Sequence, residues 1–76
     1  MQKRFAYETA IGTFYIVEHE KVFYPMFGSK TLGGYVTAQH AVDDLARGRA
    51  FKVPGVEDIA ALGIPSDLGQ WLKLSD

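Results

Sequence analysis

The sequence predicts an α+β domain: a small three-stranded antiparallel sheet, one helix packed on one face of it, and an irregular C-terminal segment. Aromatic and β-branched residues are concentrated in residues 1–36, as is typical of strands. After Thr37, apolar residues recur with the spacing of an amphipathic helix. Proline and glycine then interrupt the chain, which favours turns and short segments over long elements.

Length and composition limit the domain organisation and the partners. The chain has 76 residues, of which 47% are hydrophobic, a net charge of −1 and no cysteine. We therefore expect one domain over residues 1–76, without a disulfide framework or a cysteine-ligated metal. The longest apolar run, residues 22–27, is too short to cross a bilayer, so we expect no membrane contact and a cytoplasmic location. The near-neutral charge argues against a dominant nucleic-acid footprint.

The strands are predicted from composition and from the polar residues between them. Residues 13–18 and 22–27 form a hairpin in this interpretation, with residues 19–21 as the connection. Pro25 cannot donate to a ladder, so either regular pairing ends near Tyr24 or Pro25 faces an unpaired side or a bulge. Residues 31–35 are predicted as the third strand, and residues 3–9 are compatible with an additional edge strand.

The helix is the clearest element. Thr37 is a suitable N-cap, because its hydroxyl can accept from a free amide of the first turn. Gly48 can adopt the left-handed conformation that ends a helix. Between them, apolar residues lie on one stripe at Ala38, Ala41, Val42, Leu45 and Ala46.

The last third of the chain is predicted as short turns that must dock on the domain. Residues 54–55 indicate a turn, residues 57–62 one or two helical turns ended by Gly63, residues 66–68 a capped turn, and residues 71–74 a short strand. The segment is too apolar to remain in solvent. It covers either the sheet face opposite the helix or the space beside the helix, and we favour an arrangement that buries Trp71 and leaves part of one sheet face open.

Two motifs resemble a group of small bacterial proteins of uncharacterised function. Residues 32–48 carry L-G-x-Y-x-T-x(3)-A-x-x-D-L-A-x-G after a β-hairpin, and residues 63–71 carry G-I-P-x-x-L-x-x-W. The first motif is also similar to the strand-to-helix junction of small β-β-β-α DNA-binding domains. Those domains carry many arginines and lysines on the sheet, and this chain does not.

Motifs that bind cofactors or perform catalysis are not predicted. Residues 28–34 lack the Gly-Lys-Ser/Thr order of a phosphate-binding loop. His40, Asp43 and Asp44 share a helix face with metal-ligand spacing, but a solvated polar face explains them better. We therefore assign no catalytic, cofactor-binding or metal residue, expect no enzyme activity, and expect no small-molecule substrate.

A binding surface is the remaining functional hypothesis. Strand alternation places Phe14 and Ile16 on one sheet face and Tyr15 on the other, and it separates Phe23 from Tyr24 in the same way. A basic cluster with an aromatic inside it follows the helix. We predict a non-catalytic accessory module that contacts a protein partner or a second copy of itself, the alternative being a weak nucleic-acid binder. The candidate partner surface consists of Tyr15, Tyr24, Arg47, Arg49 and Lys52.

Overall fold

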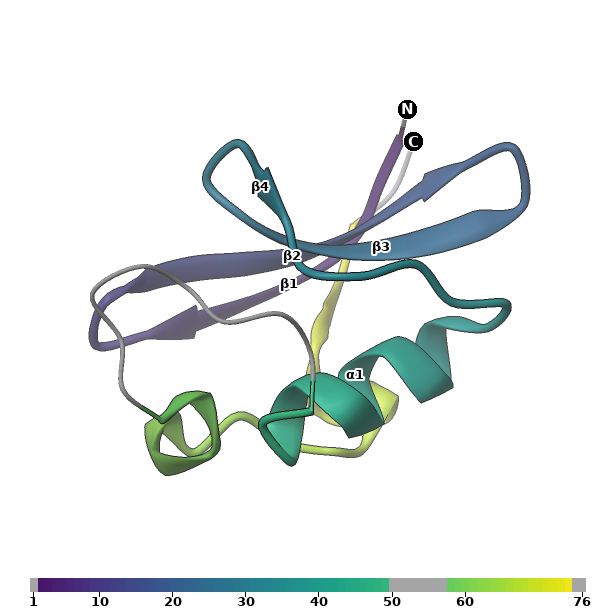
Figure 1. The fold of residues 1–76 in the computed structure, drawn as a ribbon. Coiled ribbons are helices and arrows are strands. Elements are labelled where there is room, and N and C mark those ends of the chain that lie inside the picture. Colours follow the sequence, from purple (N-terminus) through teal and green to yellow (C-terminus); the bar gives the residue numbers. More distant parts are fainter. Residues whose placement is uncertain (1, 50–57, 75–76) are drawn as a thin grey trace.

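The fold is a twisted antiparallel sheet with its helices on one side (Figure 1). The computed structural model describes residues 2–49 and 58–74. Its five strands are arranged in the order β4-β3-β2-β1-β5. The elements are β1 (Gln2–Thr9), β2 (Gly12–His19), β3 (Val22–Phe27), β4 (Lys30–Thr31), the α-helix α1 (Ala38–Ala46), the 3₁₀ turns η1 (Ile59–Leu62) and η2 (Leu68–Gln70), and β5 (Leu72–Lys73).

The α+β class is confirmed, but the prediction of three strands is wrong, because the sheet has five. Residues 2–9 form a full strand, and it is not an edge strand, since β5 pairs with its outer side through Phe5↔Lys73 and Ala6↔Leu72. The alternation of β1 is hard to recognise because its register shifts between Lys3 and Phe5. That irregularity breaks the period of two on which strand prediction depends.

The third predicted strand is much shorter than expected. Only Lys30 and Thr31 form β4, and Gly33, with φ +145°, interrupts the pairing before an isolated bridge joins Tyr35 to Phe23. Pro25 remains inside β3 opposite Ile16. Its carbonyl accepts from the Leu32 amide at 2.7 Å, on the side away from β2. The nitrogen of Pro25 lies on the same side of β3 as its carbonyl, facing Leu32. The missing N–H therefore removes no hydrogen bond between β3 and β2.

The core lies between the sheet and α1. Phe14 and Ile16 of β2 are fully buried, as are Val42 and Leu45 of the helix. Thr37 caps α1 as predicted, its hydroxyl accepting from the His40 amide at 3.1 Å. Gly48 has the predicted left-handed conformation (φ +74°).

The C-terminal segment docks beside α1, on the same side of the sheet. Trp71 is 5% exposed, and its indole Nε1 donates to the Pro65 carbonyl at 3.1 Å. The Gln39 amide of α1 donates to the Ser66 carbonyl at 2.6 Å and accepts from the Leu68 amide at 3.2 Å. The predicted turn at residues 54–55 lies outside the described residues. Docking beside the helix leaves the opposite face of the sheet without a helix among the described residues (Figure 1).

Candidate binding face of the sheet

The sheet face that points away from α1 is called here the outer face. Phe14 and Ile16 point into the core, so Tyr15 between them points to the outer face. Residues opposite each other on paired strands share a face, so Ala6, Met26 and Leu72 lie there too. By the same registers the outer face consists of Lys3, Ala6, Glu8, Thr13, Tyr15, Val17, Val22, Tyr24, Met26, Thr31 and Leu72.

The structure brings together the two tyrosines that the sequence predicts for the partner surface. Tyr15 lies opposite Met26 and Tyr24 lies opposite Val17, so the tyrosines are diagonal neighbours on adjacent strands. Both are half-buried. The Lys3 ammonium lies 4.4 Å from the centroid of the Tyr15 ring, a cation–π contact. Together they form an aromatic centre flanked by a cation.

A hollow of about 390 Å³ lies beside Tyr15, between β1 and the C-terminal strand. The small side chain of Ala6 and the side chain of Leu72, which is 65% exposed, are among those that line it. The hollow falls within the size range of known ligand sites and has an apolar character at Leu72 and Leu74. It can accept an apolar side chain from another molecule. Its lining consists of Ala6, Tyr7, Glu8, Thr13, Tyr15, Gln70, Leu72 and Leu74.

The predicted basic cluster is separate from the tyrosines. Arg47 follows α1, on the helix side of the sheet, and its Nε lies 3.0 Å from Asp43 Oδ1. Its charge is therefore partly balanced within the helix. Arg49 is exposed in the following residues, and Lys52 lies outside the described residues. The described members of the candidate partner surface therefore do not lie together, since the tyrosines are on the outer face and the arginines follow α1 on the other side of the sheet.

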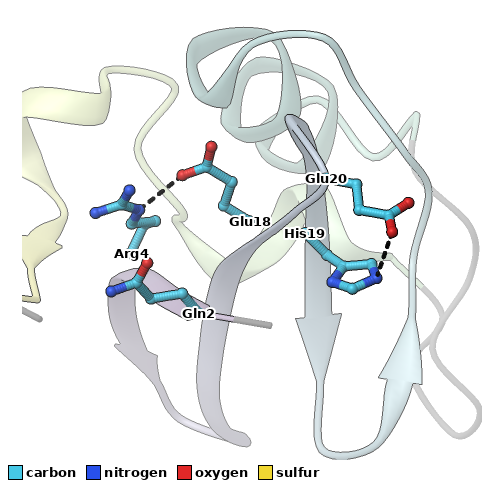
Figure 2. A pocket seen from close by; sticks show the side chains of 5 residues that line it. All are labelled: Gln2, Arg4, Glu18, His19 and Glu20. Carbon is cyan, nitrogen blue, oxygen red and sulfur yellow. Dashed lines mark hydrogen bonds and ion pairs between the residues drawn. The ribbon is translucent and has the colours of Figure 1, made fainter.

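A second hollow, of about 500 Å³, lies at the end of the sheet and was missed by sequence reasoning (Figure 2). Gln2 pairs with Glu18, which brings the start of β1 beside the tip of the β2–β3 hairpin. The Arg4 Nε donates to the Glu18 carboxylate at 2.8 Å, and His19 Nε2 lies 3.9 Å from Glu20 Oε1. This hollow is open and polar, and the side chains that line it pair with one another, Arg4 with Glu18 and His19 with Glu20. Its residues are distant in the sequence, so only the register of β1 could have revealed it.

The cluster around His40 has a structural role. The rings of His40 and Tyr35 lie 4.9 Å apart, and His40 Nε2 is 3.8 Å from Asp44 Oδ1. Burial raises the pKa of Tyr35 above its ordinary value, and the Asp44 carboxylate, which accepts a hydrogen bond from the phenol, raises this pKa further. Asp43 turns instead toward Arg47. Within residues 2–49 and 58–74, no group of three metal-ligating side chains forms.

Comparisons of the chain with models of known protein families, with curated proteins and with solved structures found no match. None of the helices among the described residues is both long and apolar enough to span a membrane. The function of this chain must therefore be inferred from its own surfaces.

Proposed function

We propose that this chain is a non-catalytic binding module that acts through protein–protein contacts, and that the outer face is its contact surface. The observation that carries the proposal is the position of Tyr15 and Tyr24 next to each other on a sheet face that no described helix covers. Tyrosine is enriched at protein interfaces because its ring supplies apolar area while its hydroxyl remains hydrogen-bonded. Leu72, 65% exposed at the margin of the same face, adds apolar area.

The charges of the outer face favour a protein over a nucleic acid. Binding to phosphates requires several cations near the stacking aromatics. On β1 the cation Lys3 is matched by the anion Glu8 on the same face, and the arginines after α1 lie on the other side of the sheet. A protein surface can complement such mixed charges. We also propose that this contact occurs in the cytoplasm, since a chain without cysteine is suited to a reducing compartment.

Site-specific photo-crosslinking tests the proposal. A benzophenone amino acid replaces Tyr24 on the outer face and, as a control, Ala61, which is exposed in η1 on the helix side. Irradiation in cells of the source organism is expected to give discrete protein adducts from position 24 and none from position 61. Adding Tyr15→Asp to the Tyr24 variant is expected to abolish the adducts, because it places a charge at the centre of the contact.

The outcomes are distinct. Protein adducts from position 24 that disappear with Tyr15→Asp support the proposal. Adducts only from position 61 overturn the assignment of the face, and adducts that nuclease removes establish the nucleic-acid alternative. Absence of any adduct from either position overturns the proposed function.

A further inference from the structure

The side chains of the outer face are arranged in rows across the sheet. The central row contains one residue from each strand and is apolar in its middle: Leu72, Ala6, Tyr15, Met26 and Thr31. Toward the start of β1, a second row contains Lys3, Val17 and Tyr24. Toward the end of β1, a third row contains Glu8 and Thr13. Opposite charges therefore flank an apolar centre on the same strand.

This pattern is self-complementary under one particular two-fold axis. Suppose that two copies stack with their outer faces together and that the two-fold axis lies between them, parallel to the central row. Rotation about this axis places each strand over the same strand of the other copy, running in the opposite direction. The central row of one copy then faces the central row of the other. Lys3 of each copy lies over Glu8 of the other, which forms an ion pair twice, as an isologous interface requires.

The shapes agree with the charges. Starting from its first residues, β1 runs from the side away from α1 down toward the helix layer (Figure 1). On the outer face, the Lys3 end of β1 therefore protrudes and the Glu8 end recedes. In the stacked pair, the protruding end of each copy lies over the receding end of the other. The same operation brings Tyr24 toward the β3–β4 turn, where Gly28 has no side chain and no atom beyond its chain neighbours lies within 4 Å of the position that a Cβ would occupy. The lining of the hollow beside Ala6 includes Ala6 and the exposed Leu72 of the central row, so the same operation brings Leu72 of the second copy close to it.

We propose that the occupant of the outer face is a second copy of this chain, stacked face to face with its strands antiparallel to those of the first. This inference rests on the proposed function and specifies its partner. Lys3 and Glu8 set the register, and the central row forms a second apolar layer between the sheets. Stacked sheets of this kind lie about 10 Å apart with strands about 30° from alignment, a distance that long side chains such as lysine and glutamate bridge.

The available area predicts a weak dimer. The two larger dimensions of the fold are 31 and 20 Å, so one face offers at most about 600 Å² to a partner. Stable interfaces begin near this value, at about 600 Å² per partner, and typically use about 800 Å². We therefore expect weak association, which sedimentation analysis at concentrations up to about 1 mM can detect.

The experiment reverses charges and then restores the pairing. Lys3→Glu alone and Glu8→Lys alone each place like charges over each other twice, and each is expected to weaken dimerisation about tenfold or more. An equimolar mixture of these two variants, and separately the double variant Lys3→Glu/Glu8→Lys, recreate both ion pairs and are expected to dimerise like the wild type. The matched control is Lys30→Glu, which changes the net charge as Lys3→Glu does but pairs with Phe27 and so points to the helix side. Circular dichroism checks that each variant is folded.

Restoration by the mixture and by the double variant, with an unaffected Lys30→Glu control, supports the inference. A wild-type chain that is monomeric up to about 1 mM overturns it, and so do single reversals that dimerise as well as the wild type. If the chain is monomeric but position 24 still crosslinks to a different protein, the second-copy inference fails while the proposed function stands. If the chain neither associates nor crosslinks, both the second-copy inference and the proposed function are overturned.

Discussion

Tyr35 lies where the chain leaves the sheet and approaches the helix. Its backbone pairs with Phe23 in both directions at 2.8 Å, and its ring rests beside His40. The side chain is half-buried, and its phenol donates to the Asp44 carboxylate. Burial disfavours the ionised phenol, and the neighbouring Asp44 carboxylate disfavours it further, which together raise the pKa of Tyr35.

This raised pKa predicts a pH dependence of stability. Because the folded state holds the Tyr35 proton more tightly than the unfolded state, the contribution is fully present below the ordinary tyrosine pKa of about 10 and is lost as the pH rises through the higher folded pKa. We expect the difference in free energy of unfolding between wild type and Tyr35→Phe to shrink above about pH 10. Urea denaturation from neutral to alkaline pH measures it. A difference that stays constant throughout would contradict the assignment.

Leu45 is a residue whose position the sequence predicts correctly. It lies at the centre of the apolar stripe of α1 and is 0% exposed. We expect Leu45→Ala to lower the free energy of unfolding by about 2–5 kcal/mol, since it removes buried methyl groups and leaves a cavity. The matched control is Val36→Ala, at a side chain that is 83% exposed, which is expected to change stability by less than about 0.5 kcal/mol. Equal effects of the two truncations in chemical denaturation would show that the helix packs differently.

At the scale of elements, the connection from β3 to α1 explains the motif L-G-x-Y-x-T. Leu32 is fully buried, and the ring of Tyr35 lies 3.0 Å from the position that a Cβ on Gly33 would occupy. Gly33 also has a positive φ, so a side chain there is disfavoured twice. Thr37 then caps the helix. Each residue of the motif has a structural role in this connection.

The turn between β2 and β3 provides an element-scale prediction. Glu20 and Lys21 have φ of +51° and +66°, and they alone among the described residues other than glycine have positive φ. Two consecutive left-handed residues match a type I′ turn, for which Asn-Gly is the favoured pair. We expect Glu20→Asn/Lys21→Gly to raise the free energy of unfolding by about 1–2 kcal/mol, because it relieves this strain.

The control for that change is the turn between β1 and β2. Ala10 and Ile11 connect β1 to β2 without positive φ. Ala10→Asn/Ile11→Gly is therefore expected to give no stabilisation. Thermal and urea unfolding of both double variants measure the difference, and an equal gain at the two turns would rule out strain as the cause.

How much of each element the sequence predicts depends on its regularity. The apolar residues of α1 and of β2 follow regular periods, and Thr37 marks the start of the helix. These signals allow the boundaries of both elements and the outer position of Tyr15 to be predicted. The register shift in β1 hides the row positions of Lys3 and Glu8. Strands of two residues, such as β4 and β5, carry no period at all and form because a neighbouring strand offers free backbone groups. Of the outer face, the sequence therefore predicts only the two tyrosines, Tyr15 and Tyr24.

At the scale of the whole molecule, stability depends on the docking of the C-terminal segment. Trp71 contacts Tyr7 of β1, with ring centroids 5.6 Å apart, and it belongs to the same core as α1. We expect Trp71→Ala to lower the free energy of unfolding by about 3–5 kcal/mol, as loss of a buried tryptophan does. That is a large part of the total stability of a domain of this size, about 4–11 kcal/mol.

Circular dichroism should follow this unfolding, because Trp71 is the single tryptophan of the chain and its fluorescence is lost with it. Trp71→Phe is the matched control, since it keeps an aromatic ring in the core and loses the hydrogen bond to the Pro65 carbonyl. We expect it to cost less than Trp71→Ala. Full stability in both variants would mean that the segment is dispensable for folding.

The pairing of β5 with β1 has a consequence for synthesis of the chain. Phe5 and its partner Lys73 lie far apart in the sequence, so during synthesis the outer edge of β1 is unpaired until Lys73 has been made. An unpaired strand edge is a template for other nascent chains. The charged residues Lys3 and Glu8 on that same strand are exposed even in the folded chain. Hydration of these two side chains opposes apolar contacts along the strand until β5 pairs with it.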